Sequence, residues 1–203
     1  MIKRGTKKEF NELISFIKEN SHSYNKIRLK LNDFSTNDGD LNQKNNMGRS
    51  LLHIAIKLKD KKLLQMLINA GVFIDLADSM GHTPLHYAVM MNRLDLVKVL
   101  VEKGADLNMG GEMEATPLHL AVSIGALPII KYLIEKGADY NQVDENNLSP
   151  IDYALDEQNK EILNYFLDKN FITTEKIEDK KIKGGILIDW KFKKVYWNDK
   201  KLY

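Results

Sequence analysis

The sequence has no cysteine among its 203 residues, and this absence removes several classes of chemistry. Without thiols, the chain cannot build a disulfide scaffold, a cysteine-bound zinc or iron–sulfur site, or a cysteine nucleophile. It also has no apolar run near the roughly 18 residues that a membrane-spanning helix needs. The first 20 residues lack the apolar stretch of an export signal. We therefore expect a cytoplasmic protein with no membrane partner.

The sequence motifs of common enzyme sites are missing as well. There is no Gly-x-Ser-x-Gly nucleophile elbow, phosphate-binding loop, dinucleotide fingerprint or His-Glu-x-x-His zinc motif. The adjacent carboxylates Asp156 and Glu157 fall on a helix that we expect to face solvent, where such pairs are common. We predict that the protein is not an enzyme and has no catalytic residue and no cofactor.

The net charge is only +2, but it is unevenly distributed along the chain. Residues 1–45 contain nine Lys or Arg against six Asp or Glu. Residues 46–170 contain twelve against seventeen, and residues 171–203 nine against five. The middle of the chain is therefore acidic and both ends are basic.

Four kinds of residue recur at a spacing of 33 along the middle of the chain, which is the mark of a repeat protein. This period defines copies at 45–77, 78–110, 111–143 and 144–176. The recurring positions hold a hydroxyl residue, an alanine, a glycine or its substitute, and an Asp or Asn: Ser50, Thr83, Thr116 and Ser149; Ala55, Ala88, Ala121 and Ala154; Gly71, Gly104, Gly137 and Asn170; Asn42, Asp75, Asn108 and Asn141.

The chemistry of these residues predicts two helices in each copy. Thr83 suits a helix N-cap and Pro84 the first helical position, where a missing N–H costs nothing. Gly104 suits the left-handed residue that ends a second helix. Ala88 is small enough for neighbouring helices to approach closely.

The second copy reads Thr83-Pro84-Leu85-His86-Tyr87-Ala88, then a second apolar helix pattern, then Gly104-Ala105-Asp106-Leu107-Asn108. This pattern resembles the ankyrin repeat family. The resemblance implies an all-α solenoid of stacked helix–turn–helix units with β-turn tips. The third copy matches closely, whereas the first lacks the proline and the fourth the histidine. Copy three has Glu114 and copy four Asn147 where the first two copies have a turn glycine.

The two ends of the chain lie outside the four close copies. Amphipathic patterns over residues 9–19 and 24–34 predict that residues 1–44 form a helical capping region, a degenerate repeat. Residues 177–203 form a basic extension rich in aromatic residues. Its alternating apolar residues predict a short β-hairpin that pairs 185–190 with 195–197. This extension has the ingredients of a nucleic-acid platform, but we favour aromatic packing against the last helices.

Three histidines, His53, His86 and His119, share one position of the repeat and raise the question of a metal site. Equivalent positions of stacked repeats lie about 10 Å apart, too far for one zinc ion. Asp152 occupies the same position in the fourth copy. We therefore predict no metal, and we expect each imidazole to join neighbouring turns by hydrogen bonds.

The resemblance implies that a protein partner binds the concave face, formed by the turn tips and the exposed side of the first helices. Five of the eight methionines map to this face, three of them at the 33-residue spacing. The predicted binding residues run from basic through apolar to acidic along the copies: Met47, Arg49, Lys57, Leu58, Met80, His82, Met90, Met91, Met113, Ile124, Glu145, Asp156 and Glu157.

Two interpretations of these methionines remain open at this point. They either fold back to pack on the array or form an exposed apolar strip, which in a soluble protein usually marks a partner site. We favour the strip, and we expect the partner to be apolar at its centre, acidic toward copy one and basic toward copy four.

The sequence therefore predicts a monomeric protein-binding module without catalysis, whose partner it does not identify. An alternative is a dedicated inhibitor or immunity-type protein that covers the active site of an enzyme or toxin. A related alternative is an effector delivered into a host cell. Binding of nucleic acid through the basic tail ranks below these, and a passive spacer would have no partner.

Overall fold

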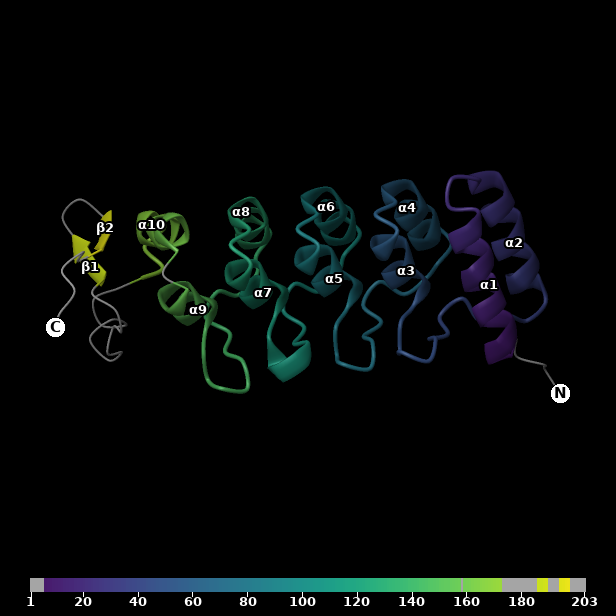
Figure 1. Ribbon diagram of the computed structural model, residues 1–203, viewed down its shortest axis with the longest axis horizontal. Helices are drawn as coiled ribbons and strands as arrows, with labels where there is room; N and C mark the ends of the chain where they lie inside the picture. Colours follow the sequence, from purple (N-terminus) through teal and green to yellow (C-terminus); the bar gives the residue numbers. More distant parts are fainter. Residues whose placement is uncertain (1–5, 158, 173–185, 190–193, 198–203) are drawn as a thin grey trace.

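The computed structural model describes residues 6–157, 159–172, 186–189 and 194–197. Helix pairs are stacked in a row, with α1 at one end and the two strands at the other (Figure 1). The first pair is α1 (Lys7–Glu19) and α2 (Tyr24–Thr36). In the four pairs that follow, a shorter helix precedes a longer one: α3 (Leu51–Lys57) and α4 (Lys61–Asn69); α5 (Pro84–Met90) and α6 (Leu94–Glu102); α7 (Pro117–Ser123) and α8 (Leu127–Glu135); α9 (Pro150–Asp156) and α10 (Lys160–Asp168). The all-α repeat solenoid predicted from the sequence is confirmed.

The helices begin and end at the residues that the repeat pattern indicates. Thr83 is the N-cap of α5 and Pro84 is its first residue. Gly71, Gly104 and Gly137 follow the second helices with φ of 86°, 89° and 96°. Asn170 adopts the same left-handed conformation, with φ of 58°, at this position of the fourth copy. Asparagine tolerates this region better than most residues do, so the substitution preserves the helix end.

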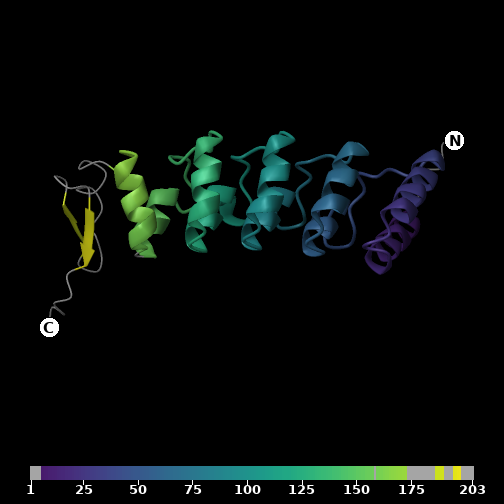
Figure 2. The same ribbon diagram turned by 90° about the horizontal axis from the view of Figure 1, so that it is seen from above.

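The alanine of each first helix allows the copies to stack. Ala55, Ala88, Ala121 and Ala154 are completely buried, and consecutive first helices contact one another along the row. The second helices form a parallel layer beside them (Figure 2). One apolar core runs from Phe10 in α1 to Ile172 after α10. The stability of such an array comes mainly from each copy packing against its neighbours.

The turns that join successive copies project from one side of the row (Figure 1). Three of them, at the starts of copies one, two and four, have a similar conformation. The turn of copy three instead contains a short 3-10 helix, η1 (Glu112–Glu114). Its difference from the others starts at Gly111, which stands where copy one has Asn45 and copies two and four have Asp78 and Asp144.

Two short strands follow the last helix. β1 (Ile186–Asp189) and β2 (Lys194–Trp197) pair antiparallel, with Ile186 opposite Trp197 and Asp189 opposite Lys194. β2 lies against α10. The predicted turn between the strands and the packing of the aromatic side chains lie outside the described residues. In the described part of the chain, no helix has the length and apolar character needed to cross a membrane.

Candidate functional site

The repeated histidines join each first helix to the next turn. The Ser50 backbone N–H donates to His53 Nδ1 at 3.1 Å, so the proton of this imidazole is on Nε2. His53 Nε2 then donates to the His82 carbonyl at 3.0 Å. Equivalent bonds run from His86 to the Ala115 carbonyl (3.1 Å) and from His119 to the Leu148 carbonyl (3.0 Å). The predicted bridging role of these histidines is confirmed.

Burial keeps these imidazoles neutral. It lowers the pKa of His53 and of His86 to about 4, and it lowers the pKa of His119 in the same direction. A neutral ring with one accepting and one donating nitrogen is the form that this bonding pattern requires. Among the described residues, no group of three or more His, Asp or Glu side chains is arranged to hold a metal ion.

A carboxylate at the start of the turn fixes the conformation of the tip. Asp78 Oδ1 accepts from the backbone N–H groups of Met80 (2.9 Å) and His82 (3.0 Å), and its Oδ2 accepts from the Tyr87 hydroxyl (2.8 Å). These hydrogen bonds lower the pKa of Asp78 against the opposing effect of its burial. Asp144 repeats the arrangement in copy four with Asn146, Leu148 and Tyr153. Asn45 Oδ1 accepts in the same way from Met47 and Arg49 in copy one. The tips of copies one, two and four are therefore held by side-chain bonds, whereas the third tip, which has Gly111 at this position, is closed by backbone bonds.

Backbone bonds join the first tip to the second and the third tip to the fourth. The Ser79 N–H donates to the Met47 carbonyl at 3.3 Å, and the Glu145 N–H donates to the Met113 carbonyl at 3.0 Å. The side chains of Met47, Met80 and Met113 are 59%, 53% and 49% exposed. Nothing in the turn geometry requires methionine, yet three successive tips present it to solvent.

Met90 and Ile124, at the ends of the first helices α5 and α7, are also exposed. We call the tips and these helix ends the tip surface. Its apolar residues are Met47, Met80, Met90, Met113 and Ile124. These are five of the eight exposed large hydrophobic residues in the described part of the chain.

Three of the residues predicted for this surface are less exposed than expected. His82 is only 8% exposed, and its ring lies 5.6 Å from that of His86. The expected exposure of this side chain is not observed, because His82 lies against Asp78, whose Oδ1 accepts from the His82 N–H and is 4.0 Å from His82 Nδ1. Leu58 and Met91 are partly buried and pack against the core. Each of these two residues follows the last residue of a first helix. This position in the repeat does not indicate whether the side chain faces solvent or the core.

The charged residues of the tip surface separate by sign along the row. Lys57 is exposed in copy one. Arg49 is half-buried there, and its Nε donates to the Tyr87 hydroxyl at 2.8 Å. Glu145, Asp156 and Glu157 are exposed in copy four. The surface is thus basic at the end next to α1 and acidic at the end next to α10.

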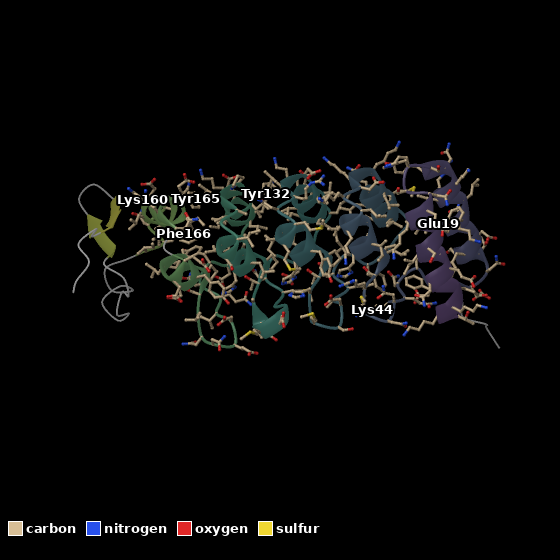
Figure 3. The ribbon with its side chains drawn as sticks, viewed as in Figure 1. Glu19, Lys44, Tyr132, Lys160, Tyr165 and Phe166 are labelled. Carbon is tan, nitrogen blue, oxygen red and sulfur yellow. The ribbon has the colours of Figure 1, made fainter. Side chains whose placement is uncertain are left out.

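The opposite side of the row, formed by the second helices, has a different character. Figure 3 shows Tyr132 and Tyr165 on this side, away from the turn end where Lys44 lies. The Nζ atoms of Lys98 and Lys136 lie 5.5 and 5.6 Å from the centre of the Tyr132 ring. Those of Lys131 and Lys169 lie 5.5 and 6.0 Å from the centre of the Tyr165 ring. None of the exposed large hydrophobic residues in the described ranges belongs to α4, α6, α8 or α10. The second helices thus lack the exposed large apolar side chains that the tips carry.

One feature of the tip surface is not apparent from the sequence. A groove of about 380 Å³ lies between α1, the first tip and α3, and Asn11 and Lys18 of α1 line it together with Met47 and Lys57. The only sequence signal was the shared helical face of Asn11 and Lys18, which are two turns apart. Because α1 lies outside the 33-residue register, the repeat pattern could not place these side chains beside the first tip.

Comparison with known families matches most of the solenoid. A family model described as ankyrin repeats (3 copies) matches residues 13–111, and another, described as ankyrin repeats (many copies), matches residues 100–154. A search of curated proteins found no match for the chain. The matched residues extend from within α1 to within α9.

Proposed function

The chain belongs to the ankyrin repeat family, whose repeats generally serve as protein–protein interaction modules, and we propose that it binds a protein partner through the tip surface. In this proposal the tip surface lies on the concave face of the array, and the protein acts as a monomer without catalysis of its own. The observation that carries the proposal is the exposure of three methionines at successive tips. Methionine is flexible and polarisable, so an exposed methionine strip can adapt to a partner's apolar side chains.

The rigidity of the tips supports this proposal. Every tip is fixed by bonds within its own copy, and the second, third and fourth tips also receive a histidine bond from the preceding copy. A surface that is ordered before binding loses less conformational entropy when the partner docks. The backbone presents the strip in one arrangement, while the methionine side chains supply the local adjustment.

The separation of charge along the tip surface supports one docking direction. A partner with acidic groups facing Arg49 and Lys57 and basic groups facing Asp156 and Glu157 meets opposite charge at both ends. The reverse orientation places like charges together, which is disfavoured. The proposed partner is therefore apolar at its centre, acidic at the end that faces copy one and basic at the end that faces copy four.

Affinity capture with two matched variants tests the proposal. In the first variant, Met80, Met90 and Met113 are changed to Glu. In the control, Leu29 and Phe73 are changed to Glu, because these residues are 67% and 63% exposed but do not belong to the tip surface. Thermal melting by circular dichroism should show that both variants fold like the wild type.

We expect wild type and the Leu29/Phe73 variant to retain the same protein from a lysate of source cells, and the methionine variant to lose it. Mass spectrometry identifies the retained protein. Retention of that protein by all three would remove the tip surface as its binding site. Loss in the control alone would place the site around Leu29 or Phe73.

A further inference from the structure

Three cationic and three apolar side chains line the groove beside α1. Lys18 of α1, Arg49 of the first tip and Lys57 of α3 line it, and no carboxylate is among its nine lining residues. Ile54, Met47 and Leu58 supply apolar surface, and the remaining lining residues are asparagines. The three cations come from three segments that only the folded array brings together.

These cations are not neutralised within the described part of the chain. Neither Lys18 nor Lys57 has a carboxylate within 4.0 Å there, whereas Lys30 and Arg93 each have one. Three like charges around one groove repel each other, and the repulsion is relieved when an anion enters between them. The structure provides no such anion from its own described side chains.

Arg49 is held in place by the second copy. Its Nε donates to the Tyr87 hydroxyl, which in turn donates to Asp78 Oδ2 at 2.8 Å. The guanidinium carbon lies 5.5 Å from the centre of the Tyr87 ring. Its Nη1 contacts Met47 Sδ at 3.0 Å, and its Nη2 has no hydrogen-bond partner among the described residues. A guanidinium fixed in this way is suited to receive a carboxylate.

We propose that this groove binds an acidic–apolar segment of the protein partner, with an Asp or Glu carboxylate between Lys18, Arg49 and Lys57 and a neighbouring aliphatic or aromatic side chain on Met47 and Leu58. This proposal rests on the protein-binding function proposed above. It adds that α1 takes part in recognition and that the groove binds the acidic end of the partner, which docks at copy one.

The lining of the groove favours a carboxylate-bearing peptide over a nucleic acid. Proteins that bind single-stranded nucleic acid combine basic residues with aromatic side chains on which bases stack. No aromatic residue lines this groove. A lining that combines three cations with three apolar side chains fits a short peptide that alternates acidic and apolar side chains.

NMR titration of the full chain tests this proposal directly. The probe is the acetylated hexapeptide Glu-Asp-Leu-Phe-Asp-Glu, added to the ¹⁵N-labelled protein up to about 2 mM, which detects weak affinities. The matched probe is Gln-Asn-Leu-Phe-Asn-Gln, which keeps the shape and removes the charge. We expect the acidic peptide to shift the amide signals of Lys18, Asn46, Met47 and Lys57, and to bind about tenfold more tightly than the neutral peptide.

Charge variants distinguish binding of the acidic peptide in the groove from its general electrostatic attraction to a basic protein. Lys18→Glu with Lys57→Glu should abolish the shifts, and Lys18→Gln with Lys57→Gln should weaken binding by about tenfold. Lys61→Glu with Lys103→Glu, which makes the same charge change on exposed residues of the second-helix side, should leave binding within about twofold. Circular dichroism melting checks that every variant is folded.

The proposal is overturned if the acidic peptide shifts no groove amide, or if both charge-reversed variants bind it equally. Tighter binding of a thymidine oligonucleotide at the same amides would overturn it in favour of a nucleic acid. The result that contradicts the groove differs from the result that contradicts the proposed function. A partner that is lost on changing Met80, Met90 and Met113 but bound normally by the Lys18/Lys57 variants contradicts the groove alone.

Discussion

At the scale of single residues, the buried histidines connect the fold to pH. Each ring donates one hydrogen bond and accepts another, and it can do both only when neutral. Desolvation lowers the pKa of His53 and of His86 to about 4, compared with about 6.5 in an unfolded chain. The folded state therefore releases protons that the unfolded state binds between these values.

The free energy of unfolding should consequently be highest above pH 6.5 and fall as the pH is lowered from 6.5 to 4. The loss at pH 4 should be of the order of 3 kcal/mol for each of His53 and His86. Asp78 and Asp144, whose pKa values are lowered, lose their contribution only at more acidic pH. Urea unfolding at a series of pH values measures this dependence. A flat profile between pH 7 and 4.5 would contradict the account.

Gly111 is a single residue that sets the shape of the third tip. A Cβ at this position would lie 2.8 Å from His82 Cδ2 and 3.0 Å from His86 Nε2, which is itself bonded to Ala115. The close approach explains why the Asp of the neighbouring copies is absent here. Gly111→Ala should lower the free energy of unfolding by about 1–3 kcal/mol in urea unfolding. Ser79→Ala in the exposed second tip should stay within about 0.5 kcal/mol, and equal effects of the two would contradict this explanation.

At the scale of elements, the left-handed residue of each turn explains why the tips tolerate different sequences. Gly48, Gly81, Glu114 and Asn147 occupy equivalent positions, and all four have positive φ. Glycine and asparagine adopt this conformation at little cost, whereas a glutamate there is strained. The third tip thus carries backbone strain that the first two avoid.

Glu114→Gly should therefore stabilise the protein by about 0.5–1 kcal/mol, because relief of strain exceeds the added freedom of the unfolded chain. Urea unfolding measures the gain. Glu102→Gly, which places a glycine at the end of α6 instead, should be destabilising. A loss of stability in Glu114→Gly would show that the conformation of this tip is not strained.

The stacking of first helices depends on the buried alanines. Ala88 is completely buried between copies, so Ala88→Glu places an unpaired charge in the core and should cost about 4 kcal/mol or more. Ser123→Glu, on an exposed position of α7, should melt close to the wild type. Wild-type melting of Ala88→Glu in circular dichroism would contradict the repeat register.

The sequence located the described helices well. Caps and glycines mark the helices of the four copies through local chemistry, and amphipathic patterns mark α1 and α2. The observed α1 and α2 extend the predicted 9–19 and 24–34 by only two residues each. The burial of His82 and the groove beside α1 could not be predicted in the same way. Both depend on how turns and helices meet in space, and α1 has no partner in the 33-residue period.

At the scale of the whole molecule, the array separates two kinds of surface. The second-helix side has lysines over Tyr132 and Tyr165, and none of the exposed large hydrophobic residues in the described ranges belongs to α4, α6, α8 or α10. The tip side has the methionine strip, basic at one end and acidic at the other. A repeat scaffold of this kind leaves its surface residues free to vary, because stacking depends on the buried ones.

Site-specific photo-crosslinking in source cells tests the central claim, that the tip surface is the binding site, most directly. A benzophenone amino acid replaces Met80 or Met113 in one set of proteins, and Leu29 or Phe73 in the other. All four positions are about half or more exposed, so solvent access does not distinguish them. We predict a crosslinked protein adduct of one mass from positions 80 and 113 and none of that mass from 29 and 73. An adduct of equal yield at all four positions, or one confined to 29 and 73, would contradict the account.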